Sequence, residues 1–178
     1  HGDKTGAFVH IRDVLDRYFE ETSFRVQPED KNLIPHINTG FDLLEKKLGG
    51  LHRSDMVILA ARPGMGKTSL AMNIARNAAI EQGAKVAIFS LEMSKLELAY
   101  RFISAETGIN NQTLRMDQLT ERQRDKVLGS LEILSEAPIY IDDSAFLRES
   151  DIKSKARRLQ NESGIDLIII DYLQLMRS

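Results

Sequence analysis

The chain has 178 residues, of which 42% are hydrophobic and 28% are charged, proportions that suit one soluble globular domain. Zero cysteines exclude disulfides and cysteine-ligated zinc, and the four histidines lack the spacing of a metal site. The net charge of −2 gives no overall attraction to nucleic acid, so contact with DNA would need a local patch or partner subunits. Because no apolar run approaches the ~20 residues of a membrane span and no signal peptide is recognisable, we expect a cytoplasmic protein without membrane partners.

The first feature in chain order is an amphipathic stretch at residues 7–21. Its apolar side chains recur at helical spacing, at Phe8, Ile11, Val14, Leu15, Tyr18 and Phe19. Residues 22–38 are polar and contain two prolines, which is typical of a connecting segment. The apolar face of such a helix must be buried. Spacing alone leaves open whether it folds back on its own chain or docks on a neighbouring subunit.

Residues 61–68 have the form of a phosphate-binding loop. They read Ala-Arg-Pro-Gly-Met-Gly-Lys-Thr and lie between an apolar, strand-like run at 56–60 and a helical pattern at 69–80. The pattern usually begins with glycine, and Ala61 takes that position here. A methyl group at the end of the strand leaves the later glycines, which lie nearest the anion, free to act. The order of strand, loop and helix indicates a protein that handles a nucleoside triphosphate.

Each residue type in the second half of this loop has a chemical reason to be there. Gly64 and Gly66 let the backbone approach phosphates closely, and the helix N-terminus supplies partial positive charge. Lys67 would reach the β- and γ-phosphates, and the Thr68 hydroxyl would hold Mg²⁺.

Strand-like and helical stretches alternate from residue 56 onward, which predicts a parallel α/β sheet. Capping-box patterns at Ser94 and Thr120 predict helix starts, and Gly83 and Gly164 stand where helix ends need a left-handed residue. Right-handed crossovers then place the carboxyl ends of all strands at the edge beside the phosphate loop. The expected strands are residues 56–60, 86–91, 139–141 and 167–171.

Carboxylates follow three of these strands. Asp171 closes an apolar run in the manner of a Walker B strand, where it would face Thr68 across Mg²⁺; the alternative is an Asp that caps the following turn. Glu92 is our candidate general base for the attacking water, although it could instead favour the dipole of the next helix. Asp142 and Asp143 form a rival pair, ranked below Glu92 because a turn-like sequence follows them.

A basic cluster lies on a predicted helix near residue 155. It could contact phosphates of DNA, but acidic residues flank it and a solvated helix face is the more common reason for such a pattern. The cluster consists of Lys153, Lys155, Arg157 and Arg158.

Three motifs, in this order, resemble those of the replicative DNA helicases of the DnaB type, which have a RecA-like motor core. They read Ala-Arg-Pro-Gly-Met-Gly-Lys-Thr-Ser at 61–69, Phe-Ser-Leu-Glu-Met at 89–93 and Asp-Tyr-Leu-Gln-Leu-Met at 171–176. Ala61 is common in that family, whereas Glu45 stands where the family more often has Asp. The resemblance covers nearly the whole chain, with further agreement at residues 39–41, 49–51, 141–143 and 157–159.

The resemblance implies an α/β fold, a RecA-like P-loop NTPase whose mainly parallel sheet is flanked by helices and preceded by an amphipathic linker helix. It implies a homo-hexamer that couples ATP hydrolysis to movement along single-stranded DNA and unwinds the duplex during replication, with primase and a helicase loader as partners. Residues 7–21 match the linker helix, which packs on the adjacent subunit in the family. We therefore expect residues 1–38 to be the linker helix and its connection, and residues 39–178 to be the N-terminal part of the ATPase domain.

The resemblance also assigns roles to single residues. Lys67 and Glu92 would be catalytic, with Glu92 activating water, and Thr68 and Asp171 would hold Mg²⁺. The expected contacts with ATP are Arg62, Pro63, Gly64, Met65, Gly66, Lys67, Thr68 and Ser69.

Parts of the family's architecture are not found in this sequence. Family members have a helical domain ahead of the linker helix and continue past the Asp171 motif with DNA-binding loops and an arginine finger. We therefore expect this chain to be a fragment that is weak or inactive as an enzyme alone. In RecA-like sheets a further strand inserts between the strands that end at Ala60 and Asp171, and we expect that slot to be empty here.

Alternatives from other classes stay open at this point. A RecA-like recombinase or another P-loop ATPase would share the fold. A P-loop kinase acting on a small acceptor would share the loop and Asp171, but it gives no reason for the leading helix or for residues 172–176. A non-enzymatic assembly module would bind nucleotide and use the helix to join a partner.

Overall fold

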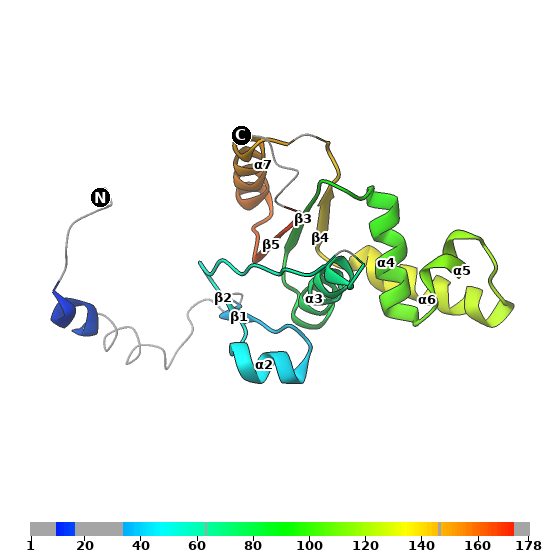
Figure 1. Ribbon diagram of the computed structural model, residues 1–178, viewed down its shortest axis with the longest axis horizontal. Coiled ribbons are helices and arrows are strands. Elements are labelled where there is room, and N and C mark those ends of the chain that lie inside the picture. The colour runs from blue at the N-terminus through cyan, green and yellow to red at the C-terminus, as the bar shows by residue number, and fades with distance from the viewer. Residues whose placement is uncertain (1–9, 17–33, 63, 146, 173–178) are drawn as a thin grey trace. The chain divides into compact units, whose positions relative to one another are not determined.

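The computed structural model describes residues 10–16, 34–62, 64–145 and 147–172 (Figure 1). The chain divides into two units, His1–Leu33 and Ile34–Ser178, and each is described by itself. In the first unit residues 11–16 are helical, and Ile11, Val14 and Leu15 are exposed. Residue 10 is not helical, and residues 7–9 and 17–21 of the predicted helix lie outside the described residues. The predicted boundary between residues 38 and 39 stays a prediction.

The second unit is built on a three-stranded parallel sheet. Its strands are β3 (Val86–Ser90), β4 (Ile139–Asp142) and β5 (Leu167–Asp171), in the order β4-β3-β5. The register pairs Ser90 with Asp171, so the carboxyl ends of β3 and β5 are level. Every residue of β3 is buried, as expected of a central strand covered on both faces. The predictions of a parallel sheet and of these three strands are confirmed.

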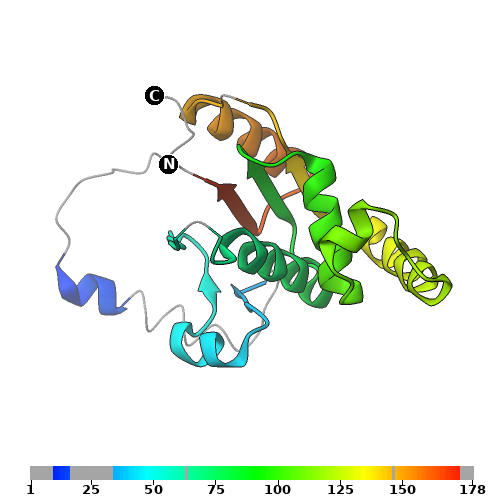
Figure 2. The ribbon, with the colours of Figure 1, turned by 45° about the vertical axis from the view of Figure 1, so that its right-hand side comes forward.

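Helices cover both faces of this sheet (Figures 1 and 2). On one face lie α3 (Lys67–Gln82) and α4 (Lys95–Thr107), and on the other lies α7 (Glu149–Glu162). The remaining helices are α2 (Asp42–Leu48), α5 (Asn111–Arg115) and α6 (Glu121–Glu136), and α5 and α6 pack on α4. No helix in the described part of the chain is both long and apolar enough to cross a bilayer.

Local signals place the ends of these helices as the sequence predicts. The capping boxes at Ser94 and Thr120 are both formed, with Glu97 and Gln123 as the reciprocal partners. Gly83 ends α3 with φ +67°, a left-handed conformation that residues with a Cβ rarely adopt.

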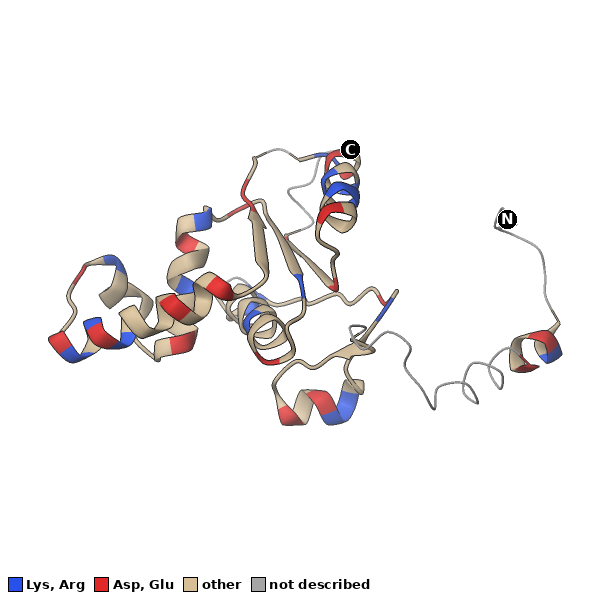
Figure 3. Ribbon diagram, turned by 180° about the vertical axis from the view of Figure 1, so that it is seen from behind, with Lys and Arg blue, Asp and Glu red and all other residues tan. Residues whose placement is uncertain are grey.

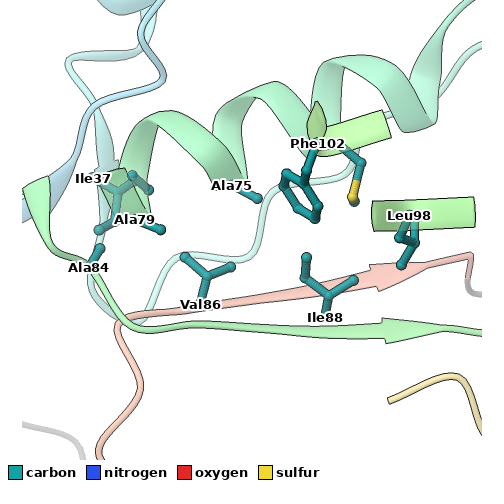
Figure 4. Packing of buried hydrophobic residues seen from close by; sticks show 10 residues of the cluster. Ile37, Ala75, Ala79, Ala84, Val86, Ile88, Leu98 and Phe102 are labelled. Carbon is teal, nitrogen blue, oxygen red and sulfur yellow. The ribbon is translucent and has the colours of Figure 1, made fainter. Parts of the chain in front are cut away.

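The main core lies between α3, α4 and the sheet (Figure 4). Ala75, Ala78 and Ala79 are 0–2% exposed on the face of α3 that meets the strands, and their small side chains let the helix come close to Val86 and Ile88. A smaller cluster on the opposite face joins β3 to α7 through Phe89, Leu147 and Ile152. Successive residues of β3 therefore serve opposite faces of the sheet, as the pleat requires.

The segment ahead of the phosphate loop is attached to α3 by side-chain hydrogen bonds. It contains a short antiparallel pair, β1 (His36–Ile37) and β2 (Leu51–His52), with α2 between them. Buried Thr39 donates from its backbone N and its Oγ1 to Glu45 Oε2, at 2.8 and 3.0 Å. Asn77 of α3 donates to the Thr39 carbonyl at 3.0 Å. Glu45, where the family more often has Asp, closes this turn.

The predicted strand at residues 56–60 is wrong. These residues have no regular secondary structure, and Met56, Val57, Ile58 and Leu59 are 78%, 58%, 70% and 40% exposed. The physical reason is the lack of a neighbour: a strand is held by hydrogen bonds to another strand, and β5 pairs only with β3 among the described residues. Among the described residues, no strand pairs with β5 in the slot that was expected between the Asp171 strand and this segment.

Replacing buried methionine by alanine tests the position of the core. Met72 on α3 is 1% exposed, whereas Met56 is 78% exposed. We expect Met72→Ala to lower the free energy of unfolding by about 2–5 kcal/mol, through lost burial and a cavity. Met56→Ala should change it by less than about 0.5 kcal/mol. Urea unfolding followed by circular dichroism measures both, and equal losses would contradict the core described here.

Candidate nucleotide-binding site

The phosphate-loop residues lead directly into α3. Gly64 and Gly66 have φ of +77° and +87°, which explains glycine at both positions through backbone conformation. Gly66 is the N-cap of α3. Among the described residues no side chain caps this helix, and no acidic residue stands in its first turn. By contrast, α4 and α6 have full capping boxes. The N–H groups at the start of α3 are therefore open to an anion from outside the chain.

Asp171 brings the end of the sheet to this helix start. Asp171 is 4% exposed as a residue, and its carboxylate accepts a hydrogen bond from Thr68 Oγ1 at 2.7 Å and lies 3.3 Å from Lys67 Nζ. Lys67 Nζ also stands 4.3 Å above the ring centre of Tyr172. The structure thus brings together Lys67, Thr68 and Asp171, as the sequence predicts. It also gives Asp171 bonding partners other than the turn that follows it.

The oxygen atoms at this point fit a magnesium ion shared with a nucleotide. Mg²⁺ prefers oxygen ligands and usually binds through one or two carboxylates together with substrate phosphates and water. The hydroxyl of Thr68 and the carboxylate of Asp171 are such a set. In the described part of the chain no group of three or more His, Cys, Asp or Glu side chains could hold a metal by itself. A metal at Thr68 and Asp171 would therefore rely on phosphate oxygens to complete its shell.

Glu92 lies in the loop that follows β3. Its neighbours are fixed: Leu91 N donates to the Asp171 carbonyl at 2.8 Å, and Ser90 Oγ bonds both the N and the O of Met93, at 3.2 and 2.7 Å. Glu92 itself is exposed and makes no side-chain hydrogen bond within the described residues. Ser94 and Glu97 form the capping box of α4, and Glu92 makes no hydrogen bond to that helix start within the described residues. Its alternative role beside the helix dipole stays a prediction.

The rival carboxylate pair at the end of β4 is occupied by structural bonds. Asp142 accepts from Lys155 Nζ at 2.5 Å, and Asp143 accepts from the backbone N of Lys95 at 3.0 Å. Burial raises the pKa of Asp142, but the bonds from Lys155 and Ser144 outweigh this and leave the pKa below its ordinary value. The bonds from Lys95 likewise lower the pKa of Asp143. Both carboxylates are held by hydrogen bonds, whereas the Glu92 side chain makes none within the described residues.

Sequence reasoning missed Arg101. Its Nη1 donates to Ser69 Oγ at 2.8 Å and so ties α4 to the first turn of α3. Its Nε is buried and has no hydrogen-bond partner in the part of the chain that the structure describes. The sequence did contain a signal. Arg101 stands between buried Leu98 and Phe102 on the stripe of α4 that faces the core, where a charged side chain is rare unless it is paired.

The predicted basic cluster lies on α7, where acidic residues stand on either side of the basic ones (Figure 3). Lys153 pairs with Glu149 at 2.5 Å, and Arg158 pairs with Glu162 at 2.8 Å. Lys155 pairs with Asp142, also at 2.5 Å. This pairing favours the solvated-face interpretation over a contact with DNA.

The rest of the predicted site adds little contact. Arg62 and Met65 are exposed, and Met65 N donates to the Arg62 carbonyl at 3.2 Å in a turn. Pro63 and residues 173–176 of the third motif lie outside the described residues.

Acid should weaken the link between β4 and α7. A carboxyl whose pKa is lowered by folding stabilises the fold above its unfolded value, 3.8 for Asp142, and the stabilisation is lost as pH falls through the folded value. We expect Asp142→Asn to lower the melting temperature at pH 7 and to have a smaller effect at pH 3. Thermal unfolding at both pH values measures this, and the same loss at each would contradict the ion pair as its cause.

Comparison with known proteins agrees with this geometry. The DnaB-like helicase C-terminal domain family matches residues 36–178. The replicative DNA helicase DnaB of Geobacillus stearothermophilus is 44% identical over 173 residues, which are 97% of this chain and 38% of that relative. The chain thus spans well under half the length of this relative.

Two solved structures show the same fold. The ATPase domain of G40P aligns over 96% of this chain and 60% of its own, with a TM-score of 0.79 and 31% identity. A DnaB-like replicative helicase, solved in work on its interactions with primase, aligns over 98% of this chain and 41% of its own, with a TM-score of 0.81 and 28% identity. The prediction of a RecA-like α/β fold is confirmed. The chain belongs to the DnaB-like helicase C-terminal domain family.

Proposed function

We propose that this chain is the nucleotide-binding part of an ATP-dependent replicative DNA helicase, which couples ATP hydrolysis to movement along single-stranded DNA and to duplex unwinding. The observation that carries the proposal is the 2.7 Å hydrogen bond between Thr68 and buried Asp171 beside the open start of α3. The identity of 44% to a replicative DNA helicase over 97% of the chain supports the choice of helicase over other P-loop proteins.

ATP binding would begin at the start of α3. The triphosphate would lie against its N–H groups, where partial positive charge favours an anion. Lys67 would turn from Asp171, 3.3 Å away, toward the β- and γ-phosphates. Thr68 and Asp171 would hold Mg²⁺, which would supply positive charge against the phosphates. The proposed contacts with ATP are Arg62, Pro63, Gly64, Met65, Gly66, Lys67, Thr68 and Ser69.

Hydrolysis needs a base that can hold a water near the γ-phosphate. Glu92 suits this role because its backbone is fixed to the end of β5 through Leu91 while its carboxylate has no bonded partner within the described residues. A carboxylate already engaged in an ion pair, as Asp142 is with Lys155, is less able to accept a proton.

The partners of the whole protein follow from the same assignment. We propose a homo-hexamer joined through the helix at residues 7–21, acting on single-stranded DNA in the cytoplasm. A primase and a helicase loader are the proposed protein partners. The primase partner is supported by the solved DnaB-like helicase whose description includes interactions with primase.

The assignment is tested by ATP turnover with and without single-stranded DNA. Turnover is to be measured for the 178-residue chain and for the proposed longer helicase that contains it, called the parent protein below. In the parent protein, DNA should stimulate turnover, and Lys67→Ala should lower kcat/KM about 100-fold or more. Lys153→Ala is the matched control because its lysine is 64% exposed and pairs only with Glu149 among the described residues.

The outcomes separate the alternative functions. Turnover that needs Lys67 but ignores DNA would favour a small-acceptor kinase or another P-loop ATPase over a helicase. Loss of turnover in Lys153→Ala as large as in Lys67→Ala would contradict the site itself.

A further inference from the structure

The loop that contains Glu92 is held at several points along its backbone. Leu91 N bonds the Asp171 carbonyl at 2.8 Å, and Ser90 Oγ bonds Met93 at its N and O. These contacts fix the loop where it leaves β3. The side chain of Glu92 is exposed and forms no hydrogen bond within the described residues. The bonds of the loop backbone therefore determine where this side chain stands.

The far end of the same loop is held from a different strand. Asp143, just after β4, accepts a hydrogen bond from the backbone N of Lys95 at 3.0 Å across 48 residues of sequence. Lys95 is the first residue of α4 and lies three positions after Glu92. The capping box serves Glu97 N and Ser94 N, so it leaves the N–H of Lys95 to another acceptor. Asp143 is that acceptor.

The backbone bond matters more than the ion pair that accompanies it. Lys95 Nζ lies 3.2 Å from Asp143 Oδ1, but the Lys95 side chain is 69% exposed and such pairs contribute little. A carboxylate on the N–H groups of a helix start has both a charge-assisted hydrogen bond and the helix dipole in its favour. The Asp143 side chain is 24% exposed, which reduces the competition from water.

The adjacent carboxylate anchors β4 in the other direction. Asp142 bonds Lys155 of α7, on the opposite face of the sheet from α4. Consecutive acidic residues thus attach the end of β4 to a helix on each face, as alternating side chains of a strand allow. Asp143, which bonds the start of α4, therefore lies at a strand end that is also bonded to α7.

We propose that Asp143 is a positioning residue for Glu92: it holds the first turn of α4 to the end of β4 and so sets where Glu92 stands relative to Asp171. This inference rests on the proposed role of Glu92 as the base. Asp143 makes no hydrogen bond or ion pair to the phosphate loop within the described residues, so its loss should act on turnover and leave ATP binding intact. Because reaction rates respond steeply to small displacements of catalytic groups, we expect about a tenfold loss of kcat.

Variants of Lys95 separate the backbone bond from the ion pair. Lys95→Ala removes the ion pair and keeps the N–H, whereas Lys95→Pro removes the N–H itself. Proline is well tolerated at the first position of a helix. It also requires an extended residue before it, and Ser94 already has φ −67° and ψ 155°. Lys95→Pro therefore deletes the donor without breaking α4.

The experiment measures kcat and KM for ATP in the parent protein with single-stranded DNA. We expect Asp143→Ala and Lys95→Pro to lower kcat about tenfold with KM for ATP within twofold, and Lys95→Ala to lower it no more than twofold. Asp143→Asn retains an acceptor and should recover at least half of the loss. In a Glu92→Gln background, Asp143→Ala should add no further loss, since the group that it positions is gone.

Each contrary outcome has a distinct meaning. If Glu92→Gln alone leaves kcat unchanged, the proposed base is wrong and the role of Asp143 is overturned with it. If Glu92→Gln lowers kcat while Asp143→Ala and Lys95→Pro do not, only the positioning role is overturned. An additive loss in the double variant, or a rise in KM without a fall in kcat, overturns it too. Should Asp143→Ala melt below the assay temperature, Lys95→Pro decides.

Discussion

The contact between Thr68 and Asp171 determines the geometry of this site. It joins the first turn of α3 to the end of β5 across 103 residues of sequence. A buried carboxylate is costly unless it is bonded, and Thr68 together with Lys67 at 3.3 Å supplies that compensation. If ATP binds as proposed, Lys67 would turn from Asp171 to a phosphate, and Mg²⁺ held by Thr68 and Asp171 would supply the positive charge that Lys67 leaves behind. The alanines on α3 make the contact possible because they bring the helix close to the sheet.

The phosphate loop and the Glu92 loop are connected by two routes. One runs through β5, since Asp171 bonds Thr68 with its side chain and Leu91 with its carbonyl. The other runs through α4, which starts beside the Glu92 loop and reaches Ser69 through Arg101 at 2.8 Å. Lys67 and Glu92, the two residues proposed to act in hydrolysis, are therefore both connected to β5 and α4. A displacement of α4 would be felt at the base and at the phosphate loop together.

Features that depend on nearby residues could be predicted from the sequence. The capping boxes at Ser94 and Thr120 and the helix end at Gly83 are set within one turn, and the apolar runs of β3, β4 and β5 identify strands, of which β3 is buried throughout. The failed strand at residues 56–60 shows the limit, because apolar composition cannot supply the neighbour that a strand must bond. The bonds of Arg101 and of Asp143 join residues 32 and 48 positions apart, where local pattern gives no partner.

The most direct test of the site is the affinity of the chain for a fluorescent ATP analogue with and without Mg²⁺, in the wild type and in Asp171→Asn. If Thr68 and Asp171 hold the metal against the phosphates, Mg²⁺ should tighten binding in the wild type, and Asp171→Asn should abolish most of that gain while retaining metal-free binding. The same gain from Mg²⁺ in both proteins would contradict the account.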